Sequence, residues 1–259
     1  MLSAGGLRGV AHLGVLRQLE RHGIRVDVIV GASAGAIIAA YYAAVGLTAT
    51  EMIEEAPAFR GHHIIMHGLT LRAHPKLKPY LRRFCGVIPN RLRQLDAARF
   101  DTLHHGIEQL GVVCHDLNRH QPCYFSTAQD HGAPLAVVAR ASAAVPGVLP
   151  SRRLTLGQRE LRLADGGLSD SLPIGFAQSP ELGATHLIVS DCRQLVSSRP
   201  PDSDNIAYIR PALDGIRTLR ASRLMNAVRW GEAAVTEDIL HRIQGWLSGQ
   251  TEWSKVAAG

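Results

Sequence analysis

Short apolar runs alternate along the chain with segments whose apolar residues recur every three or four positions. The first of these segments places Val10, Leu13, Leu16 and Leu19 on one side of a helix, which Gly23 ends. The pattern predicts strands that end at Ala4 and that cover 26–30, 112–117, 124–128, 161–164 and 187–190, and helices over 10–21, 33–45, 102–110 and, after a strand-like start, 135–144. Strands alternating with helices in this way predict an α/β domain with a largely parallel sheet.

The stretch from residue 28 to residue 50 carries no charge and is long enough to cross a bilayer. It opens on β-branched residues, however, and then contains Gly31 and Gly35, which interrupt a helix. We therefore expect a buried strand followed by a buried helix. Thr48, with Glu51 three positions later, predicts a capping box at the start of a third helix.

The composition is that of a globular protein, with 46% hydrophobic and 19% charged residues. The start of the chain shows no cationic stretch, apolar run and small-residue cleavage site, so we expect a cytoplasmic protein. No repeat or long linker divides the chain, and we expect one domain over 1–259. Residues 197–204, rich in Ser and Pro, are expected to form a loop, and the part from about residue 212 is expected to be helical.

The net charge of +6 is concentrated in one segment, because residues 56–95 contain eight lysines and arginines and no acid. Apolar residues and prolines are interleaved with these charges. We expect a basic helical cap or lid-like region that can contact an anionic membrane peripherally. The alternative is a solvated helical region that only keeps the protein soluble. No nucleic-acid-binding module accompanies the charge, and we expect no nucleic-acid partner.

The four cysteines are Cys85, Cys114, Cys123 and Cys192, and their wide spacing resembles neither a zinc site nor a disulfide scaffold. The thirteen histidines form no zinc signature either. We expect core thiols, no metal and no cofactor.

A candidate nucleophile lies at Ser33, between an apolar strand and an apolar helix, with Gly31 and Gly35 two positions away on either side. This is the context of a nucleophile elbow, a tight turn that presents the hydroxyl at a helix N-terminus. The simpler interpretation is that Ser33 only caps the helix.

A glycine-rich turn, Gly5-Gly6-Leu7-Arg8-Gly9, also lies between a strand and a helix. Backbone N–H groups there are unshielded by side chains and suit a developing oxyanion. The same turn could be a degraded dinucleotide fingerprint with Asp27 as the ribose ligand, but Asp27 precedes the second strand instead of ending it.

A candidate base is Asp165, which follows the strand at 161–164 and precedes Gly166 and Gly167. Taken alone, Asp-Gly is a common turn sequence. A Ser-His-Asp triad with His186 is the rival arrangement, although His186 adjoins an apolar strand, where a buried structural imidazole is more common.

Together these motifs resemble the patatin-like phospholipase family, a group of serine acyl hydrolases with a Ser-Asp dyad. The resemblance spans residues 2 to about 189. Its helix after the glycine-rich loop keeps His12 and Gly14, and residues 141–146 are similar to the family's Ala-Ser-x-Ala-x-Pro stretch. Ala4 stands where the family has the first of three glycines, and the family has a longer first strand.

The resemblance implies a three-layer α/β/α sandwich with a largely parallel central sheet. It implies that Ser33 is the nucleophile, that Asp165 is the base and that the amides of Gly5, Gly6 and Leu7 form the oxyanion hole. Arg8 is a candidate contact for an anionic head group, although a structural ion pair is the simpler role for it, and Ser142 and His12 are expected to be structural.

The expected activity is hydrolysis of phospholipids, lysophospholipids or related acyl lipids through an acyl-enzyme. Two alternatives stay open. One is a soluble carboxylesterase or thioesterase acting on small acyl groups, and the other is a non-catalytic module that binds lipid or anion at its helix N-termini. A nucleotide oxidoreductase is the least favoured.

Overall fold

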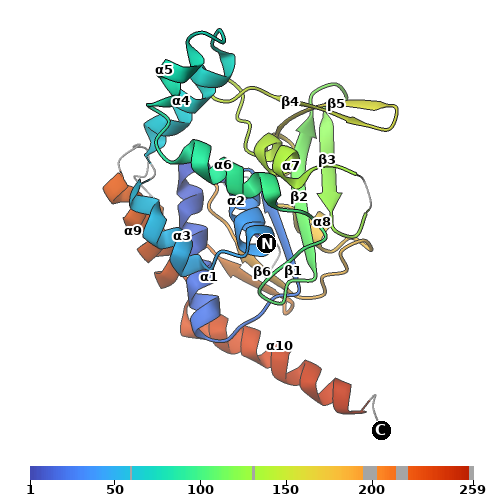
Figure 1. The fold of residues 1–259 in the computed structure, drawn as a ribbon. Helices are drawn as coiled ribbons and strands as arrows, with labels where there is room; N and C mark the ends of the chain where they lie inside the picture. The colour runs from blue at the N-terminus through green and yellow to red at the C-terminus, as the bar shows by residue number, and fades with distance from the viewer. Residues whose placement is uncertain (59, 130–131, 195–202, 214–220, 257–259) are drawn as a thin grey trace.

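The computed structural model describes residues 1–58, 60–129, 132–194, 203–213 and 221–256. A mixed sheet lies at its centre (Figure 1). The strands are β1 (Val28–Ala32), β2 (Gln109–Asp116), β3 (Gln121–Ser126), β4 (Arg152–Leu156), β5 (Arg159–Asp165), β6 (Leu187–Ser190) and β7 (Ile206–Ile209). The expectation of an α/β fold is confirmed.

The sheet is mixed and not largely parallel as expected, because three of its strand pairs are antiparallel and two are parallel. β1 runs parallel to β2, and β6 runs parallel to β7. Leu2 bridges the two pairs through parallel contacts with Gly31 and Ser190, so the expected first strand is reduced to a single bridge. β3 and β5 run antiparallel to β2, and β4 runs antiparallel to β5.

Helices cover both faces of the sheet. On β2, Leu110, Val112 and Cys114 face a core shared with α2 (Ala34–Ala40) and α7 (Leu135–Ser142). Val113 points to the opposite face, toward α8 (Ile174–Ala177). This alternation follows from the two-residue period of a strand, and it gives the three layers expected.

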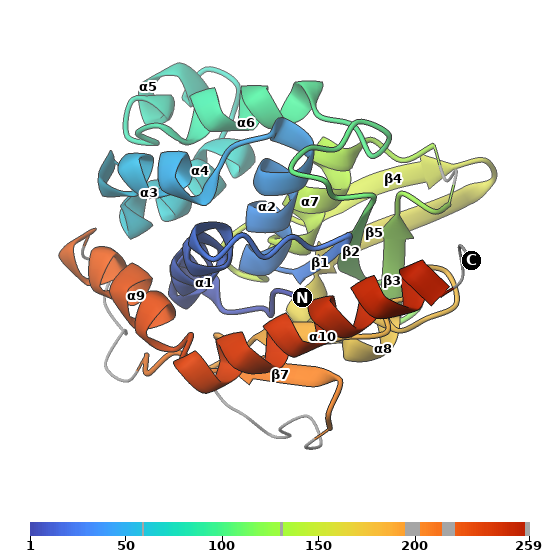
Figure 2. The same cartoon turned by 90° about the horizontal axis from the view of Figure 1, so that it is seen from below.

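The remaining helices pack around this unit. A 3-10 turn (Gly6–Val10) leads into α1 (Ala11–Arg21), and a π-helix (Tyr41–Val45) follows α2. The others are α3 (Ala49–Glu55), α4 (Gly61–Arg72), α5 (Lys78–Arg82), α6 (Ile88–Ala97), α9 (Ala221–Ala233) and α10 (Glu237–Val256). Figure 2 shows α10 alongside β7, where Arg242 and Trp246 donate hydrogen bonds to backbone carbonyls of Ile206 and Asp204.

Several expected elements are confirmed. The uncharged stretch forms β1 and α2, and no helix in the described ranges is long and apolar enough to cross a membrane. The capping box at Thr48 and Glu51 is present at the start of α3. The basic segment is helical. Its α4 and α5 project from one end of the molecule, as Figure 1 shows.

The helix expected over 102–110 does not form. His105 and Gly106 have positive φ angles of 58° and 76°, which end any helix, and β2 begins at Gln109. Gly111 lies inside β2, and a Cβ there would come within 2.8 Å of the Phe176 ring. This glycine therefore permits close packing on a strand and does not terminate a helix.

Other boundaries also differ from expectation. Residues 135–142 are helical from the start, and the sequence pattern missed β4 and β7. β4 is half-exposed and carries two arginines, and β7 is only four residues long, so neither gives a strong apolar signal. Of the loop expected over 197–204, residues 197–202 lie outside the described residues.

Helices α1 and α9 cross at a glycine contact. A Cβ on Gly14 would lie 2.0 Å from the carbonyl oxygen of Val228. We expect Gly14→Ala to lower the free energy of unfolding by about 1–3 kcal/mol, because a packed backbone must move apart. Denaturant unfolding measures the change.

Gly245→Ala is the matched control, since a Cβ on this α10 residue meets nothing within 4 Å. It should stabilise the protein by up to about 1 kcal/mol through helix propensity. Equal stability of Gly14→Ala and the unaltered protein would show that the α1–α9 contact is looser than described.

Candidate active site

The carboxyl ends of β1 and β5 meet on the same strand, β2. β1 runs parallel to β2 and ends with Ala32 beside Val113. β5 approaches from the opposite direction and ends with Asp165 beside Cys114, the next residue of β2. The residue after β1 and the last residue of β5 are therefore brought together, although they are far apart in the sequence.

Ser33 occupies the turn between β1 and α2 with a strained backbone, φ 53° and ψ −121°. Its flanking glycines permit this turn. A Cβ on Gly31 would lie 2.5 Å from the backbone of Gly35, and a Cβ on Gly35 would lie 2.4 Å from the carbonyl oxygen of Leu2. A non-glycine residue at positive φ stores strain that the surrounding structure must hold, which is common at functional sites.

Ser33 and Asp165 are directly hydrogen-bonded. Ser33 Oγ donates to Asp165 Oδ2 over 2.7 Å, and Asp165 Oδ1 accepts the N–H of Gly167 at 2.8 Å. Both side chains are buried, with residue exposures of 5% and 6%. Desolvation raises the pKa of Asp165 above its ordinary value, and the hydrogen bonds from Ser33 and Gly167 oppose this rise. A carboxylate of raised pKa is a better proton acceptor for a hydroxyl.

We expect the rate of any reaction that uses Asp165 as base to fall as pH drops through the pKa of this carboxyl. The base must be ionised, and its raised pKa moves the acid limb upward from the ordinary aspartate value of about 3.9. A profile of kcat/KM against pH measures it. If the apparent pKa of the acid limb were at or below the ordinary aspartate value, the assignment of Asp165 as base would be contradicted.

Ser142, at the end of α7, supports the turn from behind. Its Oγ accepts the backbone N–H of Ser33 at 2.9 Å and donates to the carbonyl oxygen of Val113 at 2.5 Å. Gly166 makes room for this arrangement, since a Cβ there would lie 2.1 Å from the Val113 carbonyl oxygen. The expectation that Ser142 is structural agrees with this geometry, but its position directly behind Ser33 has no signal in the sequence beyond the small-residue run.

Ser142→Ala is expected to lower the free energy of unfolding by about 1–3 kcal/mol, because a buried N–H loses its acceptor. The turn would also shift, and a displaced nucleophile can reduce the rate by up to about 10²-fold. Thermal unfolding and kcat measure the two effects. Ser248→Ala on α10 is the control. If the two variants had the same Tm and the same kcat, a supporting role for Ser142 would be contradicted.

The glycine-rich loop lies against this turn. A Cβ on Gly9 would lie 2.6 Å from the Cβ of Ala34, the residue after Ser33. In the described part of the chain, the amides of Gly5, Gly6 and Leu7 donate to no protein acceptor. The N–H of Ser33 is engaged by Ser142, so an anion beside Ser33 would need other donors, and the loop amides are candidates for this role.

Ala4 fits where a glycine was expected because the facing residue has no side chain. A Cβ on Gly167 would lie 3.0 Å from the Cβ of Ala4. The N–H of Ala4 donates to the carbonyl oxygen of Ser171 at 2.9 Å. The methyl group is thus accommodated beside Gly167.

Arg8 holds the loop to the segment after β6. Its guanidinium donates to the carbonyl oxygens of Cys192, Arg193 and Leu213 at 3.1–3.3 Å. These contacts favour a structural role over contact with a head group. These three partners are backbone carbonyls, and each ties the glycine-rich loop to a segment far along the chain.

His12 lies behind the loop and is fully buried. Burial lowers its pKa to about 4, so the imidazole is neutral near pH 7. Its Nε2 lies 3.0 Å from the Ser3 carbonyl oxygen, which only accepts, so Nε2 carries the proton and Nδ1 accepts from Ser190 Oγ at 2.7 Å. His12 is therefore a structural donor, as expected.

His186 and Asp27 lie away from Ser33. Both precede strands, β6 and β1, whose carboxyl ends lie at the Ser33 side of the sheet. His186 is exposed, contrary to the buried imidazole expected, and bonds Thr185. Neither the triad nor the dinucleotide arrangement is supported.

Three cysteines are buried as expected, and Cys123 is half-buried.

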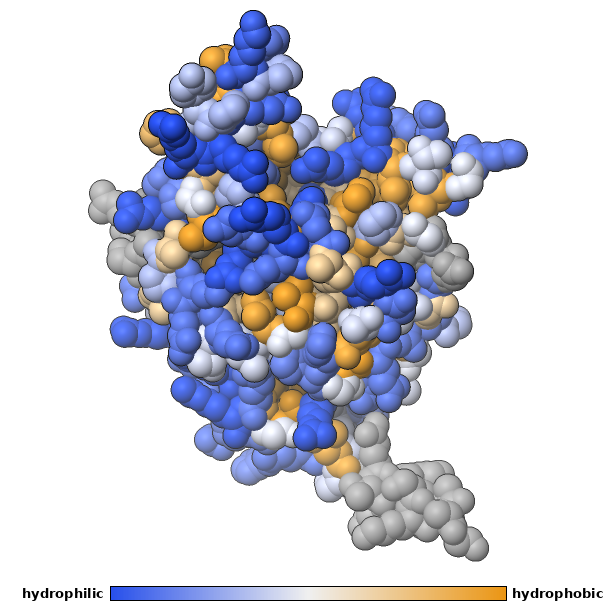
Figure 3. Space-filling view, viewed as in Figure 1, coloured by the Kyte–Doolittle hydropathy of each residue, from blue (hydrophilic) through white to orange (hydrophobic). Residues whose placement is uncertain are grey.

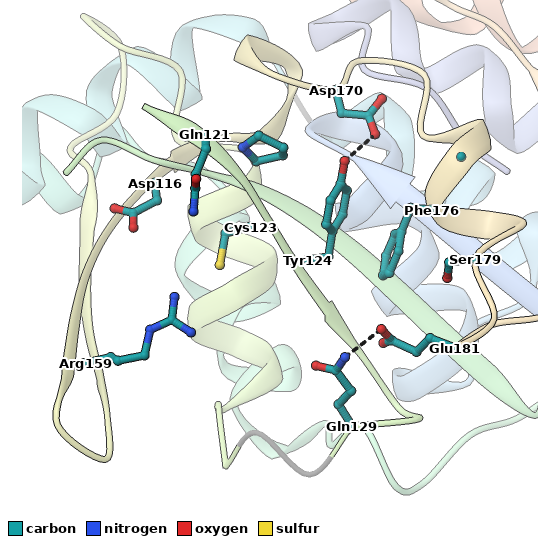
Figure 4. A pocket seen from close by; sticks show the side chains of 12 residues that line it. Asp116, Gln121, Cys123, Tyr124, Gln129, Arg159, Asp170, Phe176, Ser179 and Glu181 are labelled. Carbon is teal, nitrogen blue, oxygen red and sulfur yellow. Dashed lines mark hydrogen bonds between the residues drawn. The ribbon is translucent and has the colours of Figure 1, made fainter. Parts of the chain in front are cut away.

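A cavity of about 530 Å³ lies along β3, away from this site. Neither Ser33, Asp165 nor the glycine-rich loop lines it. Figure 4 shows two hydrogen-bonded pairs among its polar side chains, Tyr124 with Asp170 and Gln129 with Glu181. The dyad is therefore not placed in this hollow.

Comparison with known proteins identifies relatives of the chain. The sequence pattern of the patatin-like phospholipase family matches residues 1–177. An uncharacterized NTE family protein of Mycobacterium tuberculosis (strain ATCC 25618 / H37Rv) is 32% identical over 177 residues, 67% of this chain and 43% of that protein. Lysophospholipase NTE1 of Candida albicans is 51% identical over 43 residues, 17% of this chain and 3% of that protein.

A solved structure shares the fold. VipD from Legionella pneumophila matches with a TM-score of 0.56 at 14% identity, covering 94% of this chain and 66% of that chain. The chain spans less than half the length of the curated relatives named above.

Proposed function

Because the chain belongs to the patatin-like phospholipase family, we propose that it is a serine acyl hydrolase that cleaves ester bonds of phospholipids, lysophospholipids or related acyl lipids. The observation that carries the proposal is the 2.7 Å hydrogen bond from Ser33 Oγ to Asp165, made near a loop in which the amides of Gly5, Gly6 and Leu7 have no acceptor among the described residues. Ser33 is the nucleophile and Asp165 the base in this proposal, and Gly5, Gly6 and Leu7 supply the oxyanion hole.

In the first step Ser33 Oγ attacks the ester carbonyl carbon, and its proton passes to Asp165 Oδ2. The carbonyl oxygen becomes an oxyanion that the loop amides stabilise, each typically contributing about 2.7–4 kcal/mol to lowering the barrier. Collapse expels the alcohol or lysolipid, which takes the proton from Asp165. Water, deprotonated by Asp165, then attacks the acyl group on Ser33. Collapse breaks the bond between the acyl group and Ser33 Oγ, which takes back the proton from Asp165, and the fatty acid is released.

Lipid is the favoured substrate class because the rim of the site exposes apolar side chains. Val145 and Val148, which follow Ser142, are 40% and 36% exposed, and Leu168, which follows Gly167, is 53% exposed. An acyl chain can cover this apolar surface. We also propose that the basic segment 56–95 brings the protein to its lipid substrate as a peripheral contact.

The test is incubation with mixed phospholipids and lysophospholipids, followed by mass analysis of released fatty acids and lysolipids. Labelling by a fluorophosphonate, mapped to Ser33, is the companion measurement, since only an activated serine reacts. Absence of labelling would support the non-catalytic lipid- or anion-binding module. Activity on monomeric esters or thioesters without an increase on aggregated lipid would support the soluble esterase or thioesterase.

A further inference from the structure

The basic segment divides into two parts that differ in how their charges are paired. On α6, Arg91 forms an ion pair with Glu55, and Asp96 at the end of that helix pairs with Arg140. Residues 61–84, which comprise α4 and α5, are called the arm. Their cations Lys76, Lys78, Arg82 and Arg83 are exposed and form no ion pair with any described residue.

Large apolar side chains are exposed among these cations. Leu77, Tyr80 and Phe84 are 55%, 65% and 60% exposed. Figure 3 shows the protruding arm, at the top of the view, with hydrophilic and hydrophobic residues next to one another. A purely solvated basic helix would not expose such residues together, because exposed aromatic side chains favour association.

The arm lies toward the end of the molecule to which the strand before Ser33 points. In Figure 1 the arrowhead of β2 points toward the end that carries α4 and α5. β1 is parallel to β2, so Ser33, which follows β1, lies toward that end.

The arm is also fixed to the rim of the site. A Cβ on Gly68 would lie 2.1 Å from the Val148 carbonyl oxygen, and Arg72 Nη1 donates to the same oxygen at 3.0 Å. Four residues before Val148, the carbonyl oxygen of Ala144 accepts the N–H of Asp165 at 3.2 Å. Residues 144–148 therefore connect the arm to Asp165, since one end of this segment contacts α4 and the other binds the Asp165 backbone.

We propose that the arm is a docking surface for an anionic phospholipid bilayer. Its four unpaired cations attract the anionic head groups, and Leu77, Tyr80 and Phe84 enter the boundary between head groups and acyl chains. Docking sets the rim, and with it Ser33, against the lipid. This inference rests on the proposed function for its substrate. Nucleic acid is a weaker partner, because the aromatic side chains project from a helical arm and accompany no recognised module.

The first experiment measures binding by sedimentation with vesicles of equal phosphatidylcholine and phosphatidylglycerol, and with vesicles of phosphatidylcholine alone. We expect salt-sensitive binding to the anionic vesicles only. The Arg82→Ala/Arg83→Ala variant should bind roughly 30-fold more weakly, given the usual contribution of a cation near an anionic surface. Arg25→Ala/Arg229→Ala, which removes two exposed cations outside the arm, is the matched control.

Equal weakening by the two double variants would overturn the proposal, because it would assign binding to net charge. Equal binding to the two kinds of vesicle would overturn it as well. The second variant, Tyr80→Ser/Phe84→Ser, should reduce the binding that remains at high salt. If it binds as the unaltered protein does, no side chain enters the lipid and the surface is not a membrane-docking one.

Sedimentation involves no bond cleavage, so its outcome does not depend on the Ser33–Asp165 chemistry. Hydrolysis of a short soluble ester by the unaltered protein tests that chemistry separately. Vesicle binding without hydrolysis would support docking and contradict the proposed function. Hydrolysis without vesicle binding would support the proposed function and contradict docking.

Discussion

Replacing Ser33 by alanine is expected to reduce ester hydrolysis roughly 10⁴- to 10⁶-fold, because the variant lacks the oxygen that forms the acyl bond. The loop amides would remain, so a small residual rate above that in water is expected. Hydrolysis of a chromogenic ester and of lysophospholipid measures the loss. The backbone strain at this position is the same for both side chains, so the fold should persist.

Ser179→Ala is the matched control for this change. Ser179 lies in the cavity along β3, and its Oγ is buried without a hydrogen-bond partner, so its removal should leave activity intact. A Ser33→Ala protein with activity comparable to that of the control would place the nucleophile elsewhere.

Asp165→Asn is expected to lower kcat by about 10²- to 10⁴-fold, the usual contribution of a general base. The amide can still accept the N–H of Gly167, but it cannot take a proton from Ser33. Since burial raises the pKa of the carboxyl in the folded state, ionised Asp165 costs stability as pH rises through that pKa. The variant should therefore not lower Tm at neutral pH.

Asp170→Asn provides the comparison, because Asp170 is also a partly buried carboxylate of raised pKa but bonds Tyr124 and not a serine. We expect little change in its kcat. If His186→Asn reduced activity as much as Ser33→Ala, a Ser-His-Asp triad would replace the dyad.

The candidate residues could be predicted from the sequence because each lies in a local pattern. Ser33 and Asp165 both follow apolar strands and precede small residues. Their contact could not be predicted in this way, since it depends on β5 running antiparallel along the same strand to which β1 is parallel. No periodicity encodes the choice of neighbouring strand.

The errors in the expected elements have a related cause. The apolar residues near Leu110 suit a helix as well as a strand, and pairing with β1 decides between them. β7 gives little signal because only four residues pair with β6. Likewise, the fit of Ala4 in the glycine-rich loop depends on Gly167, which faces it from far along the chain.

The attachment of both β1 and β5 to neighbouring residues of β2 has a consequence for inactivation. Separating the hydroxyl from the carboxylate requires releasing a central strand from its neighbours, and strands of this kind open only with the whole molecule. Heat or denaturant should accordingly remove activity and secondary structure in one shared transition, with no folded but inactive state between them.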